Sequence, residues 1–188
     1  MANVDAAFGA IPIKHLDGAP YNGMVNEYSI PAADGTAVYL GDFVKSAGSA
    51  DTDGVPDVAQ AAAGDALLGV VVGFRADPSD LTLQYRKAST LRYALVADAP
   101  DVIVAMQEDS DGGALAVADV GNNADIIVAA GSTVTGRSKM EVDSSTKATT
   151  TAQVRVLRLY KNSENATGNQ AIWECMVNEH EHKSTTGT

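Results

Sequence analysis

The strongest constraint on the fold of this chain is its pattern of short apolar runs broken by turn-forming residues. From residue 36 onward, runs rich in Val, Ile, Leu and Tyr alternate with Gly, Asp, Asn and Ser, which is typical of β-strands joined by tight connections. Some runs alternate apolar and polar residues, as in a strand with one buried face. Others are apolar throughout, which is typical of a central strand or of a surface covered by another subunit. We therefore expect an all-β fold, an antiparallel β-sandwich or β-barrel with little helix. The expected strands cover residues 36–44, 66–74, 81–86, 91–97, 102–107, 114–118, 124–130, 139–143, 152–160 and 171–180.

One segment leaves helix and strand open. In "DVAQAAAGD", residues 57–65, Pro56 and Asp57 could begin a short helix and Gly64 could end it. The same residues could equally lead into a strand.

The first 35 residues differ in composition from the rest of the chain. Pro12, Pro20 and Pro31 exclude a long helix there, although the segment carries several large apolar side chains. We expect an extended N-terminal arm (1–35) that packs along its own domain or a neighbouring subunit, then a β-rich domain (36–182) and a disordered tail (183–188). A frayed leader is the alternative for the arm. The candidate contact residues of the arm are Phe8, Ile11, Ile13, Tyr21 and Tyr28.

The charge of the chain limits the partners that it can bind, and its cysteine content indicates the compartment in which it folds. The formal net charge of -11 argues against binding to nucleic acid or an anionic membrane, because affinity for phosphate depends on Lys and Arg. A single cysteine excludes an intramolecular disulfide and fits a reducing compartment. The start of the chain lacks the basic and apolar regions of a secretory signal, and the longest apolar run, 66–74, is far below the roughly 20 residues that span a bilayer. We expect a soluble protein made in a cytoplasm.

The stretch "AIWECMVNEHEH", residues 171–182, concentrates rare residue types. In a strand, alternation places Trp173 and Cys175 on one face, as a core face with a large aromatic anchor. His180 and His182 share a direction, but a metal site needs at least a third ligand and the remaining histidine lies in the arm. We therefore expect no metal, and a solvated polar end where the sheet stops.

Other chemical motifs are incomplete. "DTDGVPD" (51–57) and "EDSDGG" (108–113) resemble fragments of calcium loops, but neither has the glutamate that completes such a loop, so both are interpreted as acidic turns. The sequence contains no G-x-S-x-G nucleophile motif and no phosphate-binding loop. We expect no catalytic or cofactor-binding residues and no enzymatic activity.

Several segments in order along the chain resemble one family. They are "MANVDAAFG", "HLDGAPYNG", "VYLGDFVK", "AAAGDALLGVVVGF", "RYALVADAPDVIVAMQED", "ADVGNNADI" and "VNEHEH". From residue 2 to residue 182 the chain resembles the head decoration, or cement, proteins of tailed bacteriophages. The resemblance implies a small β-rich protein that binds the outside of the icosahedral capsid as a dimer or trimer and reinforces the lattice. It carries no residue-level binding motif.

The residues and the resemblance together predict a structural virion protein on the capsid exterior, synthesised in the cytoplasm of a bacterial host. Its expected partners are the major capsid protein and further copies of itself, with no nucleic acid, membrane or cofactor. A phage tail tube or head-tail joining protein is the alternative within the virion. A carbohydrate-binding β-sandwich is the alternative from another class, although it would need exposed aromatic side chains and the one Trp falls on a core face.

Overall fold

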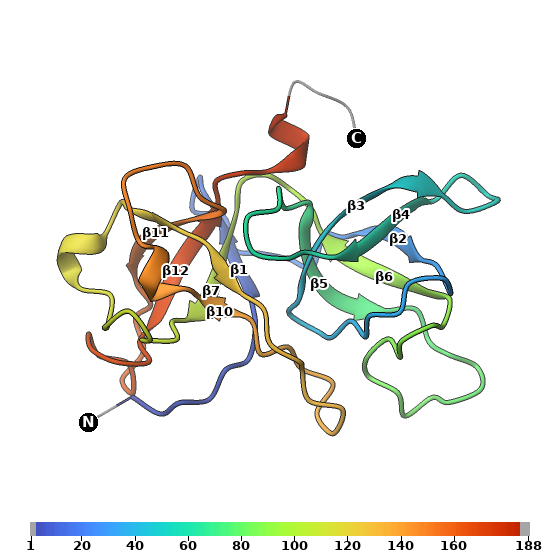
Figure 1. Cartoon of the computed structure of the whole chain (residues 1–188), viewed down its shortest axis with the longest axis horizontal. Coiled ribbons are helices and arrows are strands. Elements are labelled where there is room, and N and C mark those ends of the chain that lie inside the picture. Colours follow the sequence, from blue (N-terminus) through green and yellow to red (C-terminus); the bar gives the residue numbers. More distant parts are fainter. Residues whose placement is uncertain (1–2, 185–188) are drawn as a thin grey trace.

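The computed structural model describes residues 3–184 and contains two β-structures, a five-stranded antiparallel sheet and a closed five-stranded barrel (Figure 1). The sheet has the order β1-β7-β12-β11-β8 and the barrel the order β2-β4-β3-β5-β6. All pairings in both are antiparallel except the single β2–β4 pair, Ser29 with Asp57, which closes the barrel. The bounds of the sheet strands are β1 Ile11–His15, β7 Val102–Gln107, β8 Asn123–Ala124, β11 Val154–Leu159 and β12 Ile172–Val177. The bounds of the barrel strands are β2 Asn26–Ile30, β3 Phe43–Ala50, β4 Pro56–Gln60, β5 Gly69–Phe74 and β6 Arg92–Ala97.

Smaller elements complete the fold. The hairpin of β9 (Ile126–Ile127) and β10 (Glu141–Val142) packs beside the sheet, with β10 contacting β7. Three 3-10 turns, η1 (Val117–Asp119), η2 (Ser144–Thr146) and η3 (Glu181–Lys183), are the helical turns of residues 3–184. The expected all-β class with antiparallel sheets and little helix is confirmed. Within the described range, no helix is long and apolar enough to cross a membrane.

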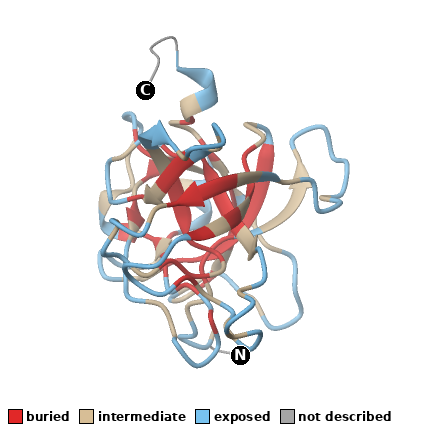
Figure 2. Cartoon of the chain, turned by 90° about the vertical axis from the view of Figure 1, so that its right-hand side faces the viewer, coloured by how far each residue is buried: buried red, intermediate tan, exposed pale blue. Residues whose placement is uncertain are grey.

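Two cores explain why some runs are apolar on both faces. One core lies between the sheet and the barrel and includes Trp173 and Cys175, while the second fills the barrel. On β3, Phe43 faces the first core and Val44 the second, and on β5 Val70 and Val71 divide in the same way. Because both sides of these strands are covered by the same chain, the run 66–74 is that of a central strand, and no second subunit is needed to cover it. Buried strands surrounded by exposed loops are visible from the barrel end (Figure 2).

The N-terminal segment is part of both β-structures. β1 pairs with β7 along the edge of the sheet, and β2 pairs with β6 in the barrel. The expected division at residue 35 therefore separates two strands of one barrel, because β2 lies before it and β3 after it. The proline spacing was right to exclude a helix, yet Pro12 sits within edge strand β1, a place where a missing N–H is tolerated. The expected disordered tail begins at Lys183, which belongs to η3; its last residues, 185–188, lie outside the described part.

Two strand expectations were wrong, and two more were wrong in extent. Residues 81–86 form no strand, with only Arg86 in an isolated bridge to Val38, and residues 114–118 lead into η1. The strand expected at 36–44 begins only at Phe43, and the one expected at 124–130 is divided between β8 and β9 and ends at Ile127. The segment left open at 57–65 forms β4 up to Gln60, so it is a strand.

Candidate interaction surface

The most exposed aliphatic side chains of the barrel side lie on two neighbouring loops. We call loops 75–91 and 128–140 the loop face; both extend from the lower side of the molecule in Figure 1. Leu81 is 79% exposed and Val134 is 92% exposed. The two loops thus offer exposed aliphatic side chains that another molecule can cover.

Two buried arginines hold the first loop. Arg86 is fully buried, and its guanidinium donates to the backbone carbonyls of Pro31, Asp34, Thr36 and Thr90. Burial lowers the pKa of Arg86 somewhat, which the nearby Asp34 carboxylate partly offsets. The carbonyls of Pro31 and Asp34 also accept from the N–H groups of Asp34 and Ser89, so Arg86 joins an existing turn to Thr90 and fixes the path of the loop at its end.

Arg92, at the start of β6, holds the same loop from the other side. Its guanidinium donates to the carbonyls of Leu83 at 2.9 Å and Tyr85 at 2.5 Å, and its Nε donates to the carbonyl of Arg75 at 3.2 Å. Its cationic group also lies 5.1 Å from the centroid of the Phe74 ring. Leu81 is thus displayed on a loop whose two sides are both tied to buried side chains.

The second loop packs on the first. Tyr39, which lies outside both loops, connects them: its ring stacks on that of Tyr85 with centroids 5.0 Å apart, and Gly131 of the second loop lies against it. Gly136 lies directly over Gln84 with a positive φ of 69°, a conformation and a close approach that both favour glycine. Its carbonyl also accepts from the N–H of Leu40 at 2.9 Å. The two loops therefore form one surface. A shallow hollow lies beside it, lined by Gly35, Thr36, Ala37, Tyr39, Gln60, Val128, Ala129 and Ala130.

The arm residues expected to make contacts are spread over different environments. Ile11 is 39% exposed on the edge strand, whereas Phe8, Ile13 and Tyr21 are partly buried. Tyr28 is only 8% exposed, and its hydroxyl donates to Asp98 at 2.6 Å. Tyr28 is thus a barrel core residue rather than a contact residue, and Ile11 is the most accessible of the set. The loop face was missed because Leu81 and Val134 resemble strand or turn residues in the sequence.

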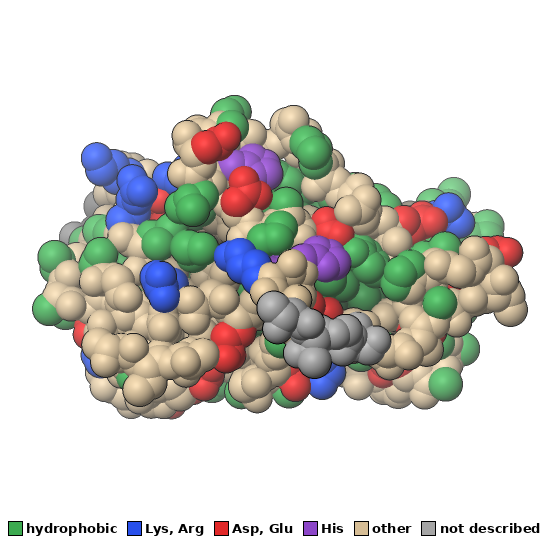
Figure 3. Space-filling view, turned by 90° about the horizontal axis from the view of Figure 1, so that it is seen from above, with side chains coloured by type: hydrophobic (Ala, Val, Ile, Leu, Met, Phe, Trp, Pro, Cys, Tyr) green, Lys and Arg blue, Asp and Glu red, His purple; other side chains and the backbone are tan. Residues whose placement is uncertain are grey.

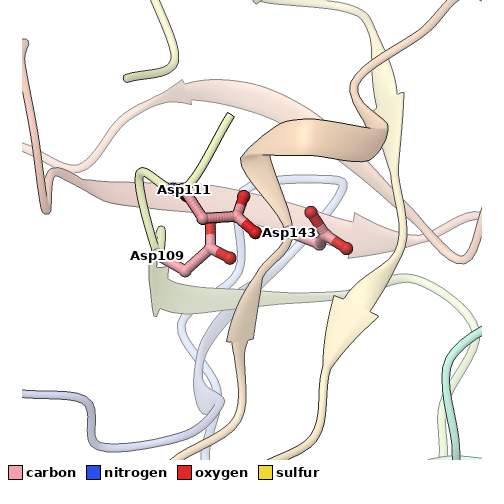
Figure 4. A group of neighbouring side chains, drawn as sticks. All are labelled: Asp109, Asp111 and Asp143. Atoms are coloured by element: carbon pink, nitrogen blue, oxygen red, sulfur yellow. Dashed lines mark hydrogen bonds between the residues drawn. The ribbon is translucent and has the colours of Figure 1, made fainter. Parts of the chain in front are cut away.

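Three carboxylates meet where two acidic segments approach. Asp109 and Asp111 follow β7, while Asp143 follows β10, and one oxygen from each lies within 4.8 Å of the others (Figure 4). One oxygen of Asp109 already accepts from the N–H and the hydroxyl of Ser144, at 3.0 and 2.8 Å. The sequence placed Asp109 and Asp111 in an acidic turn, and no local signal linked Asp143 to them. Calcium sites take about six to eight oxygen ligands, so the three carboxylates form only part of such a set.

The remaining reactive side chains are packed or paired. Cys175 is completely buried, and burial, followed by the charge of Glu174, raises the pKa of its thiol to about 12. His15 Nδ1 lies 3.2 Å from an oxygen of Asp101. The expected core placement of Trp173 and Cys175 is confirmed. The expected solvated end at His180 was wrong, because that side chain is buried against the barrel.

No protein-family model, curated protein or solved structure matches this chain.

Proposed function

We propose that this protein is a structural virion protein that binds the outer surface of a phage head and stabilises the capsid lattice as a decoration, or cement, protein. The observation that carries the proposal is the loop face, which displays Leu81 on a loop held by two buried arginines and Val134 on the loop that packs against it. Preorganised apolar tips lose little conformational entropy on binding, which favours adhesion to a groove between capsid subunits.

The charge of the chain supports an exterior location. A net charge of -11 would repel packaged DNA, while it would leave the apolar tips free to dock onto a protein lattice. A stable interface needs about 800 Å² from each partner, a small part of the 8930 Å² surface of this chain. If neighbouring copies on one head also contact one another, a modest affinity at each site would be enough to hold them on the lattice.

The test is co-sedimentation of the purified protein with expanded phage heads that lack it. The double variant Leu81→Asp/Val134→Asp should lose binding, because two charged groups would be buried at the interface. Val117→Asp is the matched control, since Val117 is 70% exposed on η1, away from the loop face. Unchanged melting temperatures would show that the variants fold.

The outcomes distinguish failure of the proposed function from failure of the proposed contact surface. Failure of the native protein to sediment with any such heads would reject the decoration proposal. Binding that survives the double variant but is lost in Ile11→Asp would keep the function and move the contact to the arm edge. Loss of binding in Val117→Asp alone would reject the loop face.

A further inference from the structure

The chain segment after β12 crosses from the sheet to the barrel and is held at both ends. We call residues 178–184 the C-terminal clasp. On the sheet side, the amide of Asn178 donates to the carbonyl of Ala152 and its N–H to the carbonyl of Gln153, at 2.9 and 2.8 Å. On the barrel side, the Leu67 N–H donates to the Glu179 carbonyl at 2.8 Å, and the Glu181 N–H donates to the Leu67 carbonyl at 3.0 Å.

Further contacts bind the clasp directly to β3 and to Asp98, and through Asp98 to β2. A carboxylate oxygen of Glu181 accepts from the N–H of Ser46 on β3 at 2.8 Å. His182 Nε2 lies 3.6 Å from a carboxylate oxygen of Asp98 at the end of β6. Asp98 in turn accepts from Tyr28 and Asn26 of β2. The clasp is therefore a strap between the two β-structures. It lies on the face seen from above, where histidine and acidic side chains are neighbours (Figure 3).

The imidazole of His180 sits in the middle of the clasp and is only 4% exposed. Its Nδ1 accepts a hydrogen bond from the N–H of His182 at 3.1 Å, which caps η3. A backbone N–H can only donate, so Nδ1 must carry a lone pair and the ring must be neutral. A second proton on Nδ1 would place two donors against each other and remove the cap.

We propose that the C-terminal clasp is an acid-released strap, docked while the buried His180 ring is neutral and opened when Nδ1 takes up a proton. Opening would free the sheet and the barrel from their connection through Leu67. The proposal is independent of the function proposed above.

The groups around the ring set the direction of the effect. Burial is the main reason that the pKa of His180 falls to about 4, and His182 and Lys183 of the clasp lower it further. Asp98 on the barrel opposes them. The contact between His182 and Asp98, with Nε2 3.6 Å from the carboxylate, holds the clasp in its docked position. The buried ring must therefore dominate for acid to open the clasp.

The size of the effect follows from linkage between protonation and opening. A ring with its ordinary pKa of about 6.5 in the open state and about 4 in the docked state gains protons on opening. Acidification from pH 7 to pH 5 then raises the ratio of open to docked clasp by about 20-fold, and acidification to pH 4 by about 100-fold.

Amide hydrogen exchange followed by NMR tests the proposal. After correction for the intrinsic pH dependence of exchange, protection of the Leu67 and Glu181 amides should fall by these factors, while that of Cys175 in the sheet should fall less. His180→Asn keeps an acceptor that can cap η3 but does not titrate, so its clasp amides should stay protected. His182→Asn should retain the acid response of the native protein.

A second measurement does not depend on any variant. The His180 ring of the native protein should titrate near pH 4 when followed by its Cε1–H resonance. A ring that titrates at about pH 6 or above, or clasp amides with the same acid response in His180→Asn, would overturn the proposal.

Discussion

Replacing Glu141 by Gln should stabilise the protein above neutral pH. Glu141 lies on β10, and one of its carboxylate oxygens is buried with no hydrogen-bond partner in the described structure. Burial, and then the charges of Asp5, Asp109 and Glu108, raise the pKa of Glu141 to about 7. These acids come from the N-terminal segment and from the end of β7, so negative charges from several chain segments lie close to Glu141.

The sign and size of the effect follow from this pKa. The pKa is raised from 4.5 in the unfolded chain to about 7 in the fold, so the folded state holds the proton more tightly. The stabilising proton is present at pH 4 and is lost as the pH rises through 7. A shift of this size corresponds to at most about 3 kcal/mol above pH 8, and partial solvent screening reduces it to about 1 to 3 kcal/mol.

Urea unfolding of both proteins between pH 4 and pH 9 measures the difference. The gain from Glu141→Gln should be close to zero at pH 4, rise between pH 4.5 and pH 7, and reach a plateau above pH 8. Glu164→Gln is the matched control, because Glu164 lies exposed in a loop. A Glu141→Gln protein no more stable than the native one at pH 8.5, or one whose gain does not vary with pH, would refute the reasoning.

Three further outcomes follow from the packing. Arg86→Met should destabilise the protein by about 3 to 5 kcal/mol in urea unfolding, because four hydrogen bonds from a fully buried guanidinium to backbone carbonyls are lost; a loss below about 1 kcal/mol would contradict this role. Cys175 should react with a thiol reagent only as fast as the chain unfolds, because burial raises the pKa of its thiol to about 12, and rapid labelling of the folded protein would disprove that packing. Deletion of residues 2–30 should abolish the cooperative thermal transition, since it removes an edge strand of the sheet and a strand of the barrel; a sharp transition would show that 1–35 is a dispensable arm after all.

The strand content was predictable because it rests on local patterns. Runs such as 102–107 and 91–97 are apolar, rich in β-formers and bounded by turns, and both are strands at nearly the expected residues. Residues 81–86 show the same alternation but form turns. There the Asp80 carboxylate accepts from the N–H and hydroxyl of Thr82, and Arg92 takes the carbonyls that a neighbouring strand would use. That outcome depends on a distant side chain, so periodicity cannot reveal it.

The candidate surfaces were less predictable because they depend on which segments meet. The meeting of Asp143 with Asp109 requires β10 to lie beside β7, a pairing between residues far apart in the chain. Tyr28 resembled an arm anchor only because the strand partners of β2, which bury it, cannot be read from the run around it. His180 resembled a solvated tail because its partner Leu67 is likewise remote.

Glu141 and His180 have opposite effects on how the overall stability depends on pH. The Glu141 pKa of about 7 makes the fold less stable as the pH rises, whereas the His180 pKa of about 4 makes it less stable as the pH falls. Their contributions nearly cancel between pH 4 and pH 7, so the native protein should unfold with a stability that varies little in this range on their account. In each single variant, the stability should show the pH dependence of the group that remains. Glu141→Gln should leave a protein whose stability falls in acid, and His180→Asn one whose stability falls toward pH 8. A flat stability profile of the native protein therefore does not argue against the acid-released clasp, and the local exchange of the Leu67 and Glu181 amides is the measurement that separates the two effects.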